Sequence, residues 1–232
     1  MAEPQTNLVT RPKPIQHNPD LVRPAVAGDD AGPQPPFPVY LEGWVTRGFG
    51  RGSKDLGCPT ANLPDSSIAP YATTLSTGVY FGYARVLDPA LELAGGQSAF
   101  PDGGVGGEAA GESEQGVHDE VHPMVMSIGW NPFYNNDTRT AEVHILHEYP
   151  SDFYGKELRV VMLGFIRPEY NYSSMDALIK DIDTDKLVAL ASVARSAYLP
   201  FQSDAFFSRK STLEPPTEDP TKPRVKPGEE EA

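Results

Sequence analysis

The sequence predicts a mainly β domain, a closed antiparallel barrel with helices packed on one side. Two observations support this fold class. Segments with the alternation and the β-branched or aromatic content of strands fill the first part of the core, and helical periodicity appears only after Pro168. Strands first and helices last are typical of such a barrel. The predicted strands are 39–45, 61–63, 78–87, 123–129, 140–149 and 158–166.

The strand predictions rest on residue type and periodicity. Residues 78–87 are aromatic and β-branched, and 140–149 alternate between apolar and polar residues. Residues 158–166 are almost entirely apolar, as expected of a buried strand. Residues 152–155, Asp-Phe-Tyr-Gly, form a turn that can join these last two strands.

Two helices are predicted after the last strand. Ser173 and Asp176 have the spacing of a helix N-terminus. The run 183–185, Asp-Thr-Asp, can cap a second helix that continues to about residue 198, before Pro200. The apolar stripe predicted for this second helix consists of Leu187, Leu190, Ala191 and Ala194.

The net charge of −13 is concentrated outside the core. Residues 88–121 hold eight acidic residues, eight glycines and no Lys or Arg, which predicts an acidic Gly-rich insertion between two strands. Residues 1–36 are rich in proline, and 213–232 combine proline with six acidic residues, so both ends are predicted to be disordered. One barrel domain, 37–212, remains.

Composition excludes several classes of protein. The core is close to neutral, which argues against nucleic-acid binding driven by bulk charge. Cys58 is the only cysteine, so no intrachain disulfide can form, and a small buried side chain is the simplest interpretation. No stretch approaches the length of a membrane span. We expect a cytoplasmic monomer, with an organelle-associated pool left open.

A glycine-rich segment at 47–62 is the strongest functional signal. Its glycines let the backbone approach an anion, and its cationic side chains favour phosphate. Thr60 and Asn62 follow in a Pro-Thr-Ala-Asn turn and offer oxygen ligands for a hard cation. The run Gly-Ser-Lys-Asp at 52–55 does not match a Walker A loop. A nucleotide site and a simple hairpin loop both fit this segment alone. The candidate phosphate contacts are Gly48, Gly50, Arg51 and Lys54.

A carboxylate on the predicted strand 140–149 is the candidate general base. Glu142 lies near the start of this strand, where a carboxylate at the rim of a barrel could accept a proton. The alternative is a solvent-exposed glutamate paired with Arg139. His144 and His147 are three residues apart, which places them on opposite faces of a strand, so no zinc site is predicted.

These motifs together resemble the riboflavin kinase family, the ATP:riboflavin 5′-phosphotransferases. Further blocks resemble the family in the same order: 76–80 (Ser-Thr-Gly-Val-Tyr), 127–132 (Ser-Ile-Gly-Trp-Asn-Pro), 142–144 (Glu-Val-His), 152–155 (Asp-Phe-Tyr-Gly) and 167–169 (Arg-Pro-Glu). The resemblance implies a six-stranded Greek-key barrel with a C-terminal helix. It also implies a glycine-loop flap over MgATP, with Gly48 and Lys54 at the nucleotide.

The resemblance also implies roles for individual residues. Thr60 and Asn62 would contribute to the magnesium site, with zinc left open as a substitute, and Glu142 would be the catalytic carboxylate. The flavin side of the pocket would include Arg167, Tyr172 and Met175. The reaction would transfer the γ-phosphoryl group of ATP to the 5′-hydroxyl of riboflavin, giving FMN and ADP.

Two other classes remain as alternatives: a flavin- or nucleotide-binding barrel without turnover, and an interaction protein that recruits partners through its acidic segments. A pure binder would have no chemical need for Thr60, Asn62 and Glu142 together. Bacterial relatives carry an additional adenylyltransferase domain. Residues 1–36 are too short for one, so we expect a monofunctional kinase of the eukaryotic type.

Overall fold

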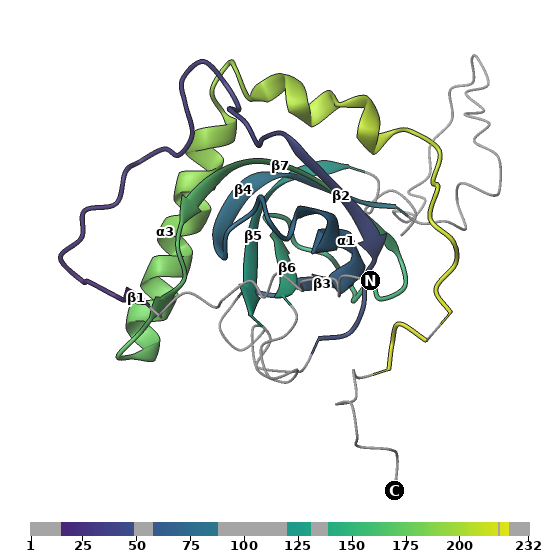
Figure 1. The fold of residues 1–232 in the computed structure, drawn as a ribbon, viewed down its shortest axis with the longest axis horizontal. Coiled ribbons are helices and arrows are strands. Elements are labelled where there is room, and N and C mark those ends of the chain that lie inside the picture. Colours follow the sequence, from purple (N-terminus) through teal and green to yellow (C-terminus); the bar gives the residue numbers. More distant parts are fainter. Residues whose placement is uncertain (1–14, 49–57, 88–119, 131–138, 218, 223–232) are drawn as a thin grey trace, which may run out of the picture.

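The computed structural model describes residues 15–48, 58–87, 120–130, 139–217 and 219–222 (Figure 1). Its main sheet consists of β2 (Val39–Trp44), β3 (Ala61–Leu63), β4 (Gly78–Leu87), β5 (Val121–Trp130), β6 (Arg139–Ile145) and β7 (Glu157–Arg167). A separate parallel pair joins β1 (Ile15–Gln16) to β8 (Tyr170–Asn171). The helices are α1 (Asp65–Ile68), α3 (Met175–Val193) and the 3-10 helices η1 (Ala69–Tyr71), η4 (Leu199–Ser203) and η5 (Ala205–Phe207).

The six strands form one curled antiparallel sheet. Their order is β2-β7-β4-β5-β6-β3, so β4, β5 and β6 form a meander and β7 returns beside β4, as in a Greek key. Within the described residues, a single bridge between Thr46 and Asn62 joins the two edges of the sheet. The predicted mainly β class and all six predicted strands are confirmed, and the sheet is a half-barrel closed at that bridge.

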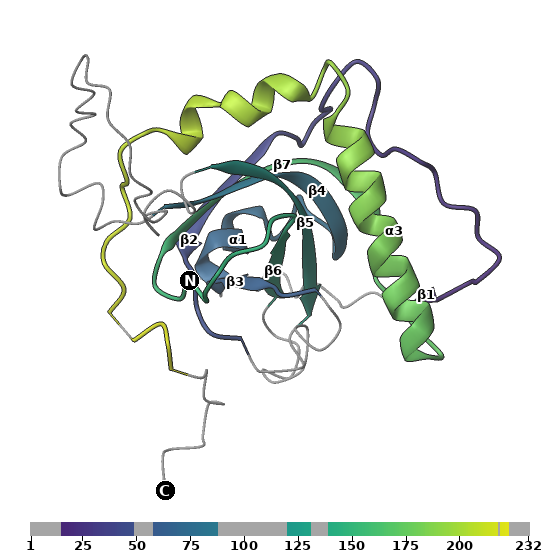
Figure 2. The same ribbon diagram turned by 180° about the vertical axis from the view of Figure 1, so that it is seen from behind.

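The curled sheet separates two apolar clusters. The concave side is filled by residues such as Leu41, Met126 and Val160, which are at most 2% exposed. The convex side packs against α3 through Phe81, Leu163 and their neighbours. Figures 1 and 2 show α3 lying across this convex side. Residues that alternate along β4 therefore serve both cores.

The prediction of two helices after β7 is wrong, because one helix, α3, spans Met175–Val193. Its N-cap is Ser174, whose side chain accepts a hydrogen bond from the Ala177 amide. Asp185, predicted as part of a second cap, lies inside the helix and is 2% exposed. It stays buried there because arginine side chains pair with it, as described below.

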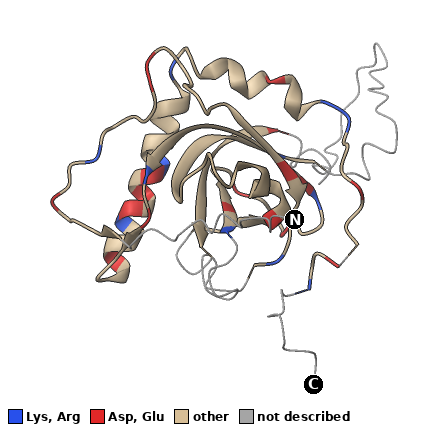
Figure 3. Ribbon diagram, viewed as in Figure 1, with Lys and Arg blue, Asp and Glu red and all other residues tan. Residues whose placement is uncertain are grey.

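The buried face of α3 is also not the predicted one. Leu187 is 68% exposed and Leu190 is 44% exposed, whereas Asp181 and Asp185 are buried together with Val188. Ala191 and Ala194 are exposed as well. Figure 3 shows that acidic and basic residues gather on α3, while most of the sheet is uncharged. An apolar periodicity cannot identify this face, because charged partners from elsewhere in the chain cover it.

Residues 15–34, which we call the N-terminal arm, pack along α3 (Figures 1 and 2). Their proline content predicts disorder, but specific polar contacts hold them. The Ala27 amide donates to Ser192 Oγ at 2.8 Å, and Arg195 pairs with Asp30 at 2.9 Å. The composition gave no information on these contacts, because each partner is more than 160 residues away.

The start of the C-terminal tail also contacts the sheet. Trp44 Nε1 donates to the Glu214 carbonyl at 2.7 Å, and the Arg47 amide donates to the Pro220 carbonyl at 3.0 Å. Residues 1–14, 88–119 and 223–232 of the predicted extension, insertion and tail lie outside the described residues. Within the described ranges, no helix is both long and apolar enough to cross a membrane.

Candidate active site

Three predicted site residues come together at one edge of the sheet. Antiparallel pairing of β3 with β6 places Asn62 directly opposite Glu142, and such cross-strand neighbours are in side-chain contact range. Thr60 Oγ1 donates to Glu142 Oε2 at 3.3 Å. All three side chains are half-buried. A carboxylate, a hydroxyl and an amide therefore form one polar cluster.

The glycine-rich segment begins at this cluster. The backbone of Gly48 lies so close to Asn62 that a Cβ at Gly48 would sit 2.6 Å from Asn62 Nδ2. The Thr46 amide also donates to the Asn62 carbonyl at 3.0 Å. Only glycine allows this close approach. The other candidate phosphate contacts, Gly50, Arg51 and Lys54, lie outside the described residues.

Arg139 does not pair with Glu142 in the way the exposed-glutamate alternative requires. The two residues are three positions apart on β6, so their side chains leave opposite faces of the strand. Arg139 is 9% exposed and donates to the Leu75 carbonyl at 2.5 Å. It anchors the loop before β4, and among the described residues Glu142 contacts Thr60 instead.

Strand register connects this cluster with the predicted flavin residues. Asn62, Glu142, Ser127, Val79 and Arg167 are successive partners across β3, β6, β5, β4 and β7. They form a row on the convex face, where α3 packs against β4, β5 and β7. Strands are spaced about 4.8 Å apart, so the three steps from Glu142 to Arg167 span about 14 Å. The two groups of predicted residues thus belong to one surface.

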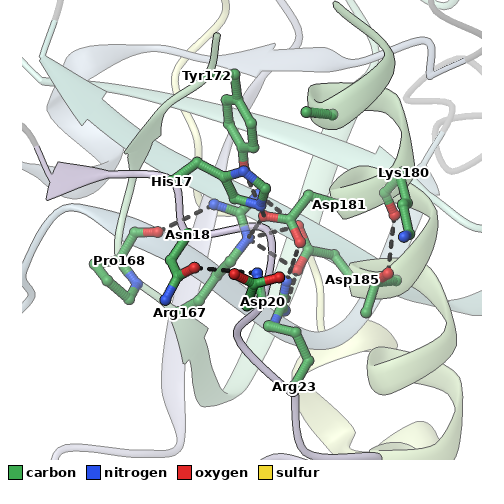
Figure 4. Close-up of polar contacts among 12 residues, drawn as sticks. His17, Asn18, Asp20, Arg23, Arg167, Pro168, Tyr172, Lys180, Asp181 and Asp185 are labelled. Atoms are coloured by element: carbon green, nitrogen blue, oxygen red, sulfur yellow. Dashed lines mark hydrogen bonds and ion pairs between the residues drawn. The ribbon is translucent and has the colours of Figure 1, made fainter. Parts of the chain in front are cut away.

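Arg167 and Tyr172 are held by the buried aspartates of α3 (Figure 4). Arg167 Nη2 lies 2.7 Å from Asp185 Oδ2, and Tyr172 Oη donates to Asp181 Oδ2 at 2.6 Å. Burial raises the pKa of Tyr172, as does its hydrogen bond to Asp181, so the phenol keeps its proton and donates it. Met175, the third predicted residue, is 57% exposed at the first turn of α3.

Arg23 completes this group, and sequence reasoning missed it. Its guanidinium spans both aspartates, with Nη1 2.7 Å from Asp181 Oδ1 and Nη2 2.6 Å from Asp185 Oδ1. Two arginines therefore balance two carboxylates. The one available signal was the i, i+4 spacing of the aspartates, which places both on one helical face. That spacing does not reveal which cations pair with them.

A cavity of about 760 Å³ adjoins the Thr60 cluster. Pro59, Thr60 and Ala61 form one wall. The other side is formed by residues 143–154, including the aromatic side chains of Tyr149, Phe153 and Tyr154. This volume falls within the usual range for sites that bind small molecules. The sequence analysis did not assign a function to this segment beyond its resemblance to a family block.

His144 and His147 both line the cavity, but with different partners, since the ring of His147 stacks on His122 at 3.9 Å between centroids. The strand ends at Ile145, and strand alternation does not extend to His147. His144 Nδ1 lies 2.8 Å from the Pro59 carbonyl. Burial lowers the pKa of His144, an effect that the Pro59 hydrogen bond opposes, and the ring is therefore neutral at physiological pH.

The donor chemistry of the cluster suits a hard cation. Thr60, Asn62 and Glu142 offer only oxygen ligands apart from the amide nitrogen, and Mg²⁺ prefers oxygen. Among the described residues, no three His, Cys, Asp or Glu side chains come together as a metal site of those ligands. A magnesium ion here would need phosphate oxygens or water to complete its coordination. These residues therefore fit a metal that arrives with a nucleotide.

Cys58 is not equipped as a nucleophile. It is 9% exposed, and burial raises the pKa of its thiol to about 11. The thiolate, which is the reactive form, is therefore scarce at physiological pH. This agrees with the prediction of a small buried side chain.

Comparison with known proteins connects this geometry to a family. A family model described as riboflavin kinase (flavokinase) matches residues 35–193. The riboflavin kinase of Pyricularia oryzae is 49% identical over 179 residues, covering 77% of this chain and 82% of the relative. That of Meyerozyma guilliermondii is 43% identical over 163 residues, covering 70% and 88%.

A solved structure supports the fold. The crystal structure of riboflavin kinase from Trypanosoma brucei matches with a TM-score of 0.51 and 24% identity, covering 76% of this chain and 92% of that one. The family match includes β2 to β7 and all of α3, and with them every described residue of the candidate site except the N-terminal arm. The chain therefore belongs to the riboflavin kinase family.

Proposed function

We propose that this protein is an ATP-dependent riboflavin kinase, which transfers the γ-phosphoryl group of MgATP to the 5′-hydroxyl of riboflavin. The products are FMN and ADP. The observation that carries the proposal is the contact of Glu142 with Thr60, opposite Asn62 and at the start of the glycine-rich segment. Family membership supplies the substrates, and the cluster supplies groups suited to this reaction.

Glu142 acts as the general base in this proposal. A carboxylate has two oxygens, so Glu142 can accept from Thr60 with one and from the riboflavin 5′-hydroxyl with the other. As the hydroxyl oxygen attacks the γ-phosphorus in line, its proton passes to Glu142 and ADP leaves. The Thr60 contact orients the carboxylate before the substrate arrives.

Thr60 and Asn62 hold the magnesium ion that accompanies ATP. Magnesium supplies positive charge that offsets the charge of the phosphates. Both protein ligands are neutral, which is reasonable because the phosphates carry the negative charge. Gly48 brings the glycine-rich segment against Asn62, so its following residues, including Arg51 and Lys54, are proposed to bind the phosphates.

The cavity next to Thr60 is proposed to bind the base of the nucleotide. It opens directly beside the proposed metal ligands, and its aromatic side chains Tyr149, Phe153 and Tyr154 can pack against a planar ring. The neutral ring of His144 avoids placing a positive charge beside the base. Phosphates at Thr60 and a base in the cavity are consistent with one bound ATP.

Riboflavin is proposed to lie along this row of the convex face, from Glu142 toward the first turn of α3. Its 5′-hydroxyl would meet Glu142, and its ring system would extend along the row of strands toward Arg167, Tyr172 and Met175. The separation of about 14 Å between the ends of this row is comparable with the length of a flavin and its ribityl chain. This placement puts the two substrates on either side of Glu142.

Incubating the protein with riboflavin and MgATP tests the proposal. We expect FMN, separated from riboflavin by chromatography and detected by its fluorescence, in an amount equal to the ADP formed. Riboflavin binding without FMN would favour the non-catalytic barrel. Failure to bind either substrate would favour the interaction protein. Omitting magnesium, with a chelator present, provides the control for the metal requirement.

A further inference from the structure

We propose that the N-terminal arm is part of the riboflavin side of the site and that Arg23 is a positioning residue for Arg167 and Tyr172. This inference rests on the proposed function, because it assumes that these two residues face riboflavin. It adds a part of the chain that lies before the family match, which begins at residue 35. The argument depends on how the two aspartates of α3 share their oxygens.

Each aspartate contacts both Arg23 and a proposed flavin residue (Figure 4). Asp181 uses Oδ1 for Arg23 at 2.7 Å and Oδ2 for the Tyr172 hydroxyl at 2.6 Å. Asp185 uses Oδ1 for Arg23 at 2.6 Å and both oxygens for Arg167, with Oδ2 2.7 Å from Nη2 and Oδ1 3.1 Å from Nε. Arg23 therefore fixes the orientation of both acceptors that hold the flavin side.

The group is buried, so its charges interact strongly. The side chains of Arg23, Asp181, Asp185 and Arg167 are 11%, 8%, 3% and 7% exposed. In a site of low dielectric, an unpaired carboxylate is costly, and each aspartate needs a cation nearby. Arg23 and Arg167 together balance the two aspartates, and Arg23 is present only while the arm is in place.

The arm also packs directly against Tyr172. The rings of His17 and Tyr172 lie 4.8 Å apart between centroids, and His17 Nε2 is 3.8 Å from Asp181 Oδ2. The pairing of β1 with β8 and the hydrogen bond from the His17 amide to the Asn171 carbonyl at 3.0 Å fix this position. The arm thus restrains the segment 170–172 by backbone, ring and charge.

Loss of Arg23 should change the flavin side selectively. Arg167 Nε is already 3.7 Å from Asp181 Oδ2, so without Arg23 the remaining arginine would be drawn between both carboxylates. Arg167 and the Tyr172 acceptor would then shift. Glu142 lies three strands away, where backbone pairing between β3 and β6 holds it in place. We therefore expect weaker binding of riboflavin and unchanged binding of ATP.

The test compares Arg23→Ala, Arg23→Lys and a matched control in the full-length protein. The control is Arg195→Ala, which releases the other end of the arm by removing the contacts of Arg195 with Asp30 and the Ala27 carbonyl. KM for riboflavin, KM for ATP and kcat are measured separately, and circular dichroism checks folding. A fluorescence titration gives the Kd for riboflavin alone.

We expect Arg23→Ala to raise the KM and Kd for riboflavin by about tenfold or more, with KM for ATP changed by less than about twofold. Arg23→Lys should fall between wild type and Arg23→Ala, because an ammonium keeps the charge but cannot span both aspartates. Arg195→Ala should change the KM for riboflavin by less than about twofold. If Arg23→Ala does not fold, the lysine variant carries the comparison.

Several results would overturn the proposal. An unchanged KM for riboflavin in a folded Arg23 variant would show that the arm has no role in binding. An equal increase in the KM for riboflavin in Arg195→Ala would indicate a general loss of stability. A lower KM for riboflavin in Arg23→Ala would mean that the arm obstructs the site. A wild type that binds riboflavin without making FMN would refute the proposed function alone, since the Kd values would still test the arm. A wild type that does not bind riboflavin would refute both.

Discussion

The two ends of the row on the convex face are held in different ways. At the Glu142 end, pairing of β3 with β6 brings half-buried side chains together, and the backbone does most of the positioning. At the Arg167 end, four buried charges from the arm, β7 and α3 hold one another. The comparison predicts that the Glu142 end tolerates side-chain changes without loss of stability, whereas the Arg167 end does not.

The largest expected effect separates chemistry from stability at the Glu142 end. Glu142→Gln should lower kcat by about 10²–10⁴-fold, because the amide cannot accept the proton. Since strand pairing positions this residue, the free energy of unfolding should stay within about 0.5 kcal/mol of wild type. Steady-state kinetics and urea unfolding measure the two quantities. Glu42→Gln, at a strand glutamate of β2 that contacts Arg209, is the matched control. Near-normal turnover would remove Glu142 from its role.

The two faces of α3 provide the next test, on stability. Asp185→Ala should lower the free energy of unfolding by about 3–5 kcal/mol, because Arg23 and Arg167 lose a buried partner. Leu187→Ser, two residues later but 68% exposed, should change it by about 0.5 kcal/mol or less. Urea unfolding of both variants measures the difference. A larger cost at Leu187 would mean that the exposed face is covered in solution.

Close backbone packing at the Glu142 end predicts a smaller catalytic effect. Gly48→Ala would place a methyl group 2.6 Å from Asn62 Nδ2, so either the loop or the proposed metal ligand must move. A displacement of about 1 Å can cost up to about 10²-fold in rate, and we expect a loss of that order in kcat/KM for ATP. The KM for riboflavin should change little. Equal effects on both substrates would contradict the separation of the two ends.

The smallest expected effect is a pH dependence at the nucleotide end. Burial lowers the pKa of His144 below its ordinary value of 6.5, so the unfolded chain takes up a proton at a higher pH than the folded protein does. The contribution of neutral His144 to the free energy of unfolding is therefore fully present above the pKa of the unfolded chain. It is lost as the pH falls toward the lower pKa of the folded protein. Urea unfolding should show a smaller stability loss between about pH 7.5 and about pH 5.5 in His144→Asn than in wild type. An identical loss of stability in His144→Asn and in wild type would show that His144 does not have a lowered pKa in the folded protein.

Local patterns in the sequence predict most of the fold. The predicted bounds of β3 and β4 match the structure, and β4 is rich in the β-branched and aromatic residues that favour strands. The pair Thr60 and Asn62 was identified from its spacing, and Glu142 from its place on a strand. Their convergence followed from the family resemblance, and the register of β3 with β6 supports it. The three are far apart in sequence, so spacing alone could not place them together.

The failures involve contacts between distant segments. Arg23 and Asp181 are separated by 158 residues, and no local pattern connects them. The inward face of α3 combines Asp181 and Asp185 with apolar residues such as Val188, and the two aspartates look like surface residues when Arg23 is not considered, which explains the wrong stripe and the wrong second helix. The predicted strand 140–149 extends too far, because β6 ends at Ile145 whereas the alternation of apolar and polar residues continues beyond it.

The position of Arg23 has a practical consequence for defining the domain. A boundary drawn where the family model begins, at residue 35, would retain every strand of the main sheet, together with α3 and the cluster of Thr60, Asn62 and Glu142. It would also remove one of the two cations that neutralise Asp181 and Asp185. The shortened protein would carry an excess negative charge in its interior. We therefore expect the minimal folding unit to begin before residue 35, within the N-terminal arm.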